Sequence, residues 1–144
     1  CGQGTNTAIH HRDPAIGKKT VGFMEAAPIF ARSIDGLTLS RVTVDGALGS
    51  GVVCKGRVEN VVIDSCTFTN LGNAAIHLGD SSYSKNTFVK GVEITNNYVR
   101  GIGTLYPASV AVIGTIIANA RVVGNTVVSV PYSAFSFGSE KHKV

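Results

Sequence analysis

The sequence is poor in charge, and acidic residues are its scarcest charged type. Asp, Glu, Lys and Arg make up 15% of the 144 residues, with 9 acidic against 13 basic side chains. Glycoside hydrolysis generally uses two carboxylates, so few residues are candidates for that reaction. The basic residues are scattered and form no stripe that could follow a phosphate backbone, so we expect no nucleic-acid partner.

Cysteine is also scarce, which argues against a disulfide framework or a zinc site. Cys1, Cys54 and Cys66 cannot all pair with one another, and no Cys/His spacing typical of zinc occurs. We expect Cys54 and Cys66 to be buried thiols. Cys1 fits either a lipid-modified cysteine or simply the first residue of the given sequence. We therefore expect no metal site. We also expect no membrane span, since Pro107 and three glycines interrupt the uncharged stretch 101–120.

What the chain does have is repeated apolar alternation. The stretch "VEITNNYVRGIG" has close relatives in "VVIDSCTFTNLG" and "RVVGNTVVSVP". Four sets of residues share the offsets 0, 3, 5 and 8: Leu39, Val42, Val44 and Ala47; Ile63, Cys66, Phe68 and Leu71; Ile94, Asn97, Val99 and Ile102; Val122, Asn125, Val127 and Val130. Self-similarity of this kind indicates a repeat architecture.

Each set is followed by a second short apolar strand, and "APIFARS" before Leu39 adds a partial copy. The periods are 24 residues (39 to 63), 31 (63 to 94) and 28 (94 to 122), as for a 24-residue coil with insertions of 7 and 4. A local period of two with many Val, Ile, Thr and Phe residues favours strands over helices. The coils must stack to bury their apolar faces, so the pattern predicts a β-solenoid. We expect Asn97 and Asn125 to share a turn column, where stacked amides hydrogen-bond along the axis.

The chain resembles the right-handed parallel β-helix repeat proteins, the superfamily of pectate lyases and many glycan-cleaving enzymes, over about residues 27–138. Within that group, "RGIGTLYPASVAVIG" and "NTVVSVPYSAFSFG" look like coils of bacterial glycosidase-like members. We therefore predict an all-β fold, a right-handed parallel β-helix of about four to five coils that belongs to a longer solenoid. Residues 1–26 would be an N-terminal segment or degenerate coil and residues 139–144 a tail.

The two insertions suggest where a site would lie. They fall in "GDSSYSKNTFVKG" and "GTLYPAS", on opposite edges of the second-strand sheet, and insertions in a solenoid usually collect on its functional face. If Ile76 and Leu78 point inward, His77 points outward, together with Val53, Val112 and Ser136. We predict an open groove there. Its candidate catalytic residues are His77, Asp80 and Lys85, and its candidate substrate-binding residues are Tyr83, Tyr106, Ser136 and Arg100.

The type of reaction stays open at this point. A hydrolase needs a carboxylate pair, and Asp80 has no convincing second member, because Glu93 shares a column with Arg121 and is better explained as an ion pair. A lyase would use Lys85, Arg100 or His77 as its base, often with Ca²⁺, although the expected Asp cluster is absent. Otherwise we expect no cofactor. His10 and His11 head the densest titratable cluster, but adjacent residues of an extended chain point in opposite directions.

Two classes of function follow from these observations. The first is a carbohydrate-active domain, a glycoside hydrolase or polysaccharide lyase that binds a polysaccharide or oligosaccharide. The alternative is a non-catalytic structural or adhesion module of a larger extracellular or phage-tail protein. Either would be extracellular, periplasmic or on the cell surface. An ice-binding solenoid would need a T-x-T ladder, which is absent. We also expect the solenoid ends to be covered by further sequence, by a partner chain or by end-to-end association.

Overall fold

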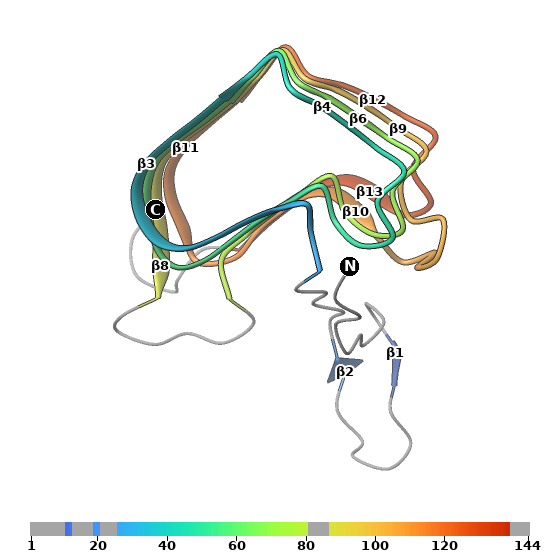
Figure 1. The fold of residues 1–144 in the computed structure, drawn as a ribbon. Coiled ribbons are helices and arrows are strands. Elements are labelled where there is room, and N and C mark those ends of the chain that lie inside the picture. The colour runs from blue at the N-terminus through green and yellow to red at the C-terminus, as the bar shows by residue number, and fades with distance from the viewer. Residues whose placement is uncertain (1–10, 13–18, 21–25, 81–86, 139–144) are drawn as a thin grey trace.

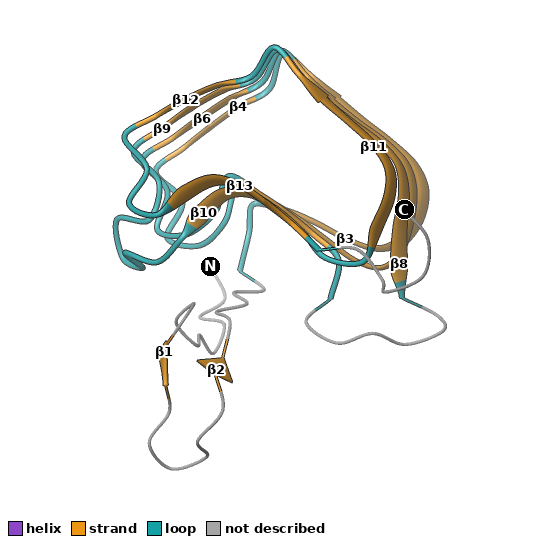
Figure 2. Cartoon of the chain, turned by 180° about the vertical axis from the view of Figure 1, so that it is seen from behind, coloured by secondary structure: helices purple, strands orange, loops and turns teal. Residues whose placement is uncertain are grey.

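The computed structural model describes residues 11–12, 19–20, 26–80 and 87–138, and all regular elements among them are strands. Within this part no helix is long and apolar enough to cross a membrane. Strands β1 (His11–Arg12) and β2 (Lys19–Thr20) form a short antiparallel pair apart from the main body (Figure 2). His10, Tyr83, Lys85 and the tail 139–144 lie outside the described residues.

The remaining strands wind into a parallel solenoid with three faces, which gives the roughly triangular outline of Figure 1. We name these faces A, B and C. Face A contains the later part of β3 (Ile29–Ser40) and of β5 (Val52–Asp64), then β8 (Phe88–Thr95) and β11 (Ile117–Val123). Face B contains β4 (Thr43–Asp45), β6 (Thr67–Thr69), β9 (Tyr98–Arg100) and β12 (Thr126–Val128). Face C contains the starts of β3 and β5, then β7 (Ile76–Leu78), β10 (Val110–Gly114) and β13 (Ser133–Phe137).

The strand registers confirm the predicted columns. On face A, Leu39 pairs with Ile63, Ile63 with Ile94, and Ile94 with Val122. On face B, Phe68 lies between Val44 and Val99. Each repeated set therefore spans two faces rather than one strand, because a residue with positive φ turns the chain between them: Arg41, Ser65, Asn96 or Gly124.

The core lies inside the triangle and is made of the inward-facing residues of all three faces. Phe68, Ile63 and Ile76 are fully buried, one from each face. Cys54 and Cys66 are free and buried, as predicted, and burial raises the pKa of the Cys54 thiol to about 11. Since burying such side chains contributes about 1.5–3 kcal/mol each, stacking of the coils is what holds the fold together.

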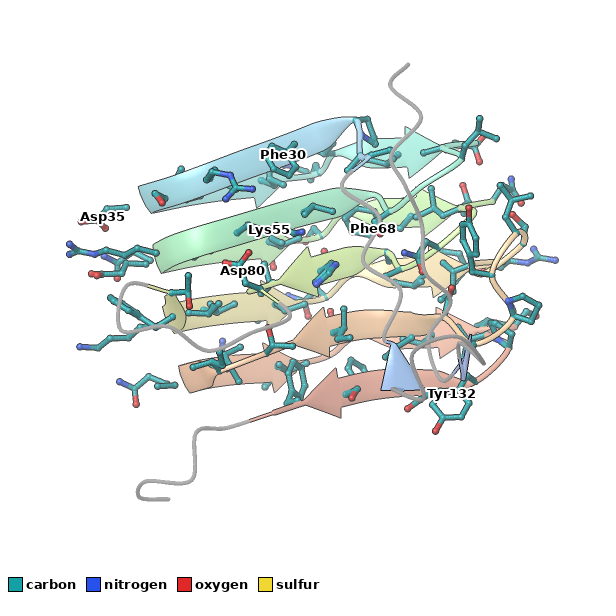
Figure 3. All side chains as sticks on the ribbon, turned by 90° about the horizontal axis from the view of Figure 1, so that it is seen from below. Phe30, Asp35, Lys55, Phe68, Asp80 and Tyr132 are labelled. Atoms are coloured by element: carbon teal, nitrogen blue, oxygen red, sulfur yellow. The ribbon has the colours of Figure 1, made fainter. Side chains whose placement is uncertain are left out.

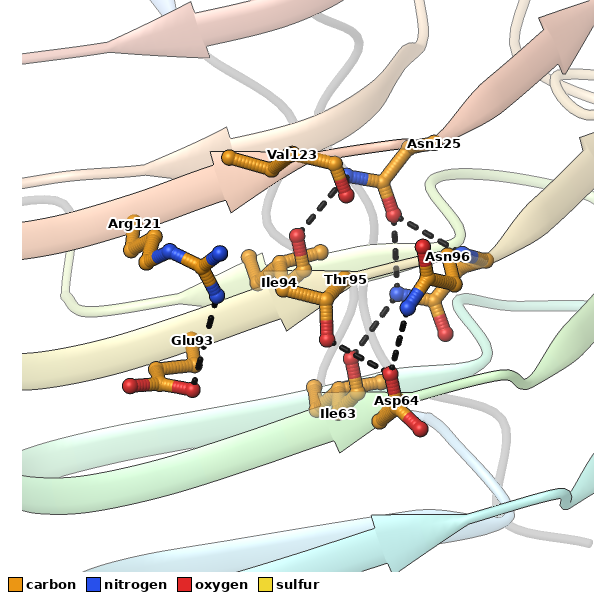
Figure 4. A network of polar contacts seen from close by, with 10 residues as sticks. Ile63, Asp64, Glu93, Ile94, Thr95, Asn96, Arg121, Val123 and Asn125 are labelled. Carbon is orange, nitrogen blue, oxygen red and sulfur yellow. Dashed lines mark hydrogen bonds and ion pairs between the residues drawn. The ribbon is translucent and has the colours of Figure 1, made fainter.

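The predicted asparagine ladder is confirmed (Figure 4). The Nδ2 atom of Asn97 donates to Oδ1 of Asn125 at 2.9 Å and to the Ile63 carbonyl oxygen at 2.9 Å. In turn, the backbone N–H of Cys66 donates to Asn97 Oδ1 at 2.8 Å. The left-handed backbone of this turn belongs to the preceding residue, Asn96 (φ 56°). Asn97 therefore serves as an internal hydrogen-bonding group between coils.

A second regularity recurs in three columns of residues with positive φ. In each, an Asn donates Nδ2 to an Asp one coil earlier: Asn60 to Asp35, Asn70 to Asp45, and Asn96 to Asp64, at 2.7, 2.8 and 3.0 Å. One coil later the position is a glycine, and the missing side chain leaves room for the Asn Oδ1 atom. These glycines are Gly91, Gly101 and Gly124. Asp, Asn and Gly thus form a three-coil unit that fixes the bends.

Candidate functional site

The predicted groove corresponds to the outer side of face C. Its outward column is Phe30, Val53, His77, Ile113 and Ser136, from the strand registers. The prediction of Val112 in this column was wrong by one residue. Val112 pairs with Ile76 and packs in the core, because the insertion in 103–109 obscured the register of the following strand.

This column is not open to solvent, which contradicts the expected groove. Val53 is 0% exposed, His77 1% and Ile113 8%. Alternation in a sequence shows which side chains point away from the core, but it does not show whether something else in the chain covers them. Only the ends of the column, Phe30 and Ser136, are exposed.

His77 lies on β7, which pairs with the strand that carries Lys55, and the charges of Lys55 and Asp80 both act on it. Figure 3 shows Lys55 and Asp80 close to each other, with Asp80 just after the end of β7. The Oδ2 atom of Asp80 accepts the backbone N–H of Gly56 at 2.7 Å, and Lys55 is 5% exposed. The pKa of His77 is lowered to about 4, chiefly by burial and to a smaller extent by the charge of Lys55, while Asp80 partly opposes both. At neutral pH the imidazole is therefore uncharged and a weak base.

Sequence reasoning missed Lys55. In "VVCKG", Lys55 stands one coil before Gly79, and the next residue, Gly56, stands one coil before Asp80. A lysine that follows an apolar run and precedes a glycine resembles an exposed turn residue, so its burial could not be anticipated.

The structure separates the other predicted residues from this cluster. Tyr106 is half-buried in the loop 103–109, where its carbonyl oxygen accepts the Ser109 hydroxyl at 2.6 Å. Ser136 shares the column of His77 but lies two strands away, on β13. Arg100 is exposed on face B, a different side of the solenoid. Lys85 and Tyr83 lie outside the described residues, so their roles stay predictions.

The acidic residues of the described part all make interactions within the fold. Asp35, Asp45 and Asp64 accept the Asn amides, Glu59 accepts Arg57 Nε at 2.7 Å, Asp80 accepts the Gly56 N–H, and Glu93 lies 3.9 Å from Arg121. The Glu93–Arg121 pair was predicted and is confirmed. Donors from Thr95, Ser65 and Asn96 hold the pKa of Asp64 below its usual range, and Thr69 and Asn70 do the same for Asp45. These carboxylates stay charged and serve as hydrogen-bond acceptors.

Face B, in contrast, is an open polar surface. The outward side chains Tyr98 and Arg100 are exposed, while Val99 between them is 1% exposed and packs inward. Arg100 continues a column with Thr69 and Asp45, in which the Thr69 hydroxyl donates to Asp45 Oδ1 at 2.6 Å. A carboxylate, a hydroxyl and a guanidinium thus follow one another at the spacing of the coils, about 4.8 Å.

No group of three or more potential metal ligands occurs among the described residues. The family model described as a right handed beta helix region matches residues 2–127. Comparisons with curated proteins and with solved structures gave no match. The family includes carbohydrate-active and non-catalytic members. The parallel three-faced solenoid and the match over most of the chain together show that this protein belongs to the right-handed β-helix family.

Proposed function

We propose that this domain binds a polysaccharide on face B and does not cleave it. The observation that carries the proposal is the open face itself, where Tyr98 and Arg100 project side by side from β9. An aromatic ring offers an apolar surface to the face of a sugar, and a guanidinium donates up to five hydrogen bonds to its hydroxyl oxygens. The neighbouring Thr69 and Asp45 add a hydroxyl and a carboxylate acceptor.

Binding without cleavage is supported by the use of the carboxylates. Hydrolysis requires an acid and a second carboxylate about 5–10 Å apart, both facing the substrate. On the described strands of face B the one carboxylate is Asp45, which already accepts hydrogen bonds from Thr69 and Asn70 and has no second carboxylate on that face. The buried neutral His77 is poorly suited to remove a proton from a substrate in solution. The proposed site needs no cofactor, and we place its ligand outside the cell or at the cell surface.

The second candidate is a non-catalytic structural or adhesion module without a glycan ligand. The same commitment of carboxylates to the fold favours it, because hydrogen-bonded coil bends are what a spacer requires. The two candidates differ in one property, the affinity of face B for glycans.

A glycan array followed by affinity measurements separates the candidates. We expect binding to at least one neutral or acidic polysaccharide. Arg100→Ala should weaken it about tenfold or more, since a hydrogen bond to a charged group contributes about 1.5–3 kcal/mol. Tyr98→Ala should also weaken it, because it removes the aromatic surface that packs on the sugar ring. Lys90→Ala is the control, because Lys90 is an exposed cation on face A. Product analysis should show no new chain ends. Absence of any binding would favour the structural module, and released oligosaccharides would overturn the assignment as a non-cleaving domain.

A further inference from the structure

A shallow depression lies on the outer side of face A, remote from the residues of face B. Its volume is about 380 Å³, and it is formed where β8 and β11 run side by side after the bend of β5. We call it the Gly91 notch and define it by Asn60, Gly91, Glu93, Asn119 and Arg121.

The notch exists because a residue without a side chain stands between two with amides. Asn60, Gly91 and Asn119 all have positive φ, at 53°, 66° and 54°. They occupy equivalent bends of successive coils, so the two amides are separated by about two coil spacings, roughly 10 Å. A side chain at position 91 would narrow this gap, and its Cβ atom would lie only 3.0 Å from Asn60 Oδ1.

The rim of the notch carries one charge of each sign. Glu93 and Arg121 lie 3.9 Å apart, and their side chains are 52% and 60% exposed (Figure 4). Such a long, exposed pair contributes little to stability. A carboxylate accepts about four hydrogen bonds and a guanidinium donates five, so most of this capacity is available to a ligand.

These features define the class of ligand. Neighbouring sugar hydroxyls can donate to a carboxylate and accept from a guanidinium at the same time, which matches the Glu93–Arg121 pair. A rim with no net charge gives no advantage to an anion, and Glu93 repels a uronate carboxylate. The volume lies at the lower end of the range for small-molecule sites. We propose that the Gly91 notch binds one or two units of a neutral sugar, independently of face B.

Backbone NMR titration with cellobiose and maltose tests this site directly, with galacturonic acid as the anionic comparison. We expect saturable shifts of amides in β8 and β11 with a neutral disaccharide, and weaker binding of galacturonic acid. Glu93→Gln and Arg121→Gln should each weaken the neutral ligand about tenfold, because each removes a charged hydrogen-bonding partner.

Lys90→Gln serves as the control, because it removes a charge from β8 outside the notch. Both test residues are exposed, and an unchanged thermal midpoint would verify that their variants are folded. Shifts confined to β4, β6, β9 and β12 would overturn the notch while leaving glycan binding on face B intact. Equal affinity in both variants and the wild type, or tighter binding of galacturonic acid, would also overturn it.

Discussion

The imidazole of His77 is 1% exposed on β7, so its charged form loses more solvation than the nearby Asp80 carboxylate returns. Lys55 adds a like charge and lowers the pKa further. From the sequence alone, His77, Asp80 and Lys85 were the candidate catalytic residues. Because it is buried, the neutral imidazole is instead part of the packing of face C. Its protonation therefore destabilises the folded state.

Stability should fall as the pH is lowered from about 6.5 to about 4. The folded-state pKa of about 4 is below the ordinary 6.5, so in this window the unfolded chain binds a proton that the folded chain does not. The loss should approach about 3 kcal/mol and then level off. Urea unfolding across this range measures it.

His77→Leu is the matched control for this pH dependence, because leucine fills much of the same buried space and has no titrating group. Its free energy of unfolding should be flat over the same window. Asp45 and Asp64 do not interfere, because their pKa values are lowered from 3.8 and their contribution is lost only at more acidic pH. An equal slope in the wild type and in His77→Leu would contradict the assignment.

At the scale of the elements, the bends decide where one strand ends and the next begins. The apolar alternation predicted the strands and their columns because side-chain period and register are linked. It did not separate face A from face B, because one left-handed residue such as Ser65 turns the chain without breaking the apolar pattern. Asn, Ser and Arg all occupy this position, so no single residue type marks it in the sequence.

Two glycine substitutions separate backbone strain from crowding at these bends. Gly46→Ala meets no atom within 4 Å, and its φ of 74° should alone cost about 1–2 kcal/mol. Gly124→Ala has a similar φ of 70° and also places its Cβ atom 2.5 Å from Asn96 Oδ1, so it should destabilise the protein more. Chemical denaturation of both variants gives the difference. Equal losses would show that the stacked Asn side chain yields freely.

At the scale of the whole molecule, stability is shared between neighbouring coils. The described coils at either end are less well covered than those between them. Leu37 and Leu39 of β3 are half-buried, and Phe135 and Phe137 of β13 are 38% and 42% exposed. That these ends are covered by further sequence, a partner chain or a second copy stays a prediction.

The position of a core residue along the stack should therefore set the cost of its removal. Phe68→Ala should cost about 3–5 kcal/mol, because Phe68 is fully buried between coils. Phe137→Ala should cost clearly less, because its ring is partly exposed. Denaturant unfolding measures both. Similar losses in the two variants would mean that Phe137 is as well covered as Phe68 in solution.

The candidate site was less predictable than the fold. The periodicity of the sequence predicted the stacking of coils and the Glu93–Arg121 column, since both depend on spacing along the chain. The periodicity could not predict that His77 and Lys55 are buried, because burial depends on contacts between segments distant in sequence. The Gly91 notch was also invisible, because it needs two asparagines of non-adjacent coils with a glycine between them.

The bonds between coils also determine how the molecule responds to mechanical load. The parallel strand pairs and the Asp–Asn contacts all join one coil to the next, along the axis of the solenoid. When tension is applied along this axis, the hydrogen bonds between one coil and the next break before those of the following coil are loaded. The protein should therefore extend in steps of one coil under low force, whereas a pull across the axis meets all strands of a face in shear.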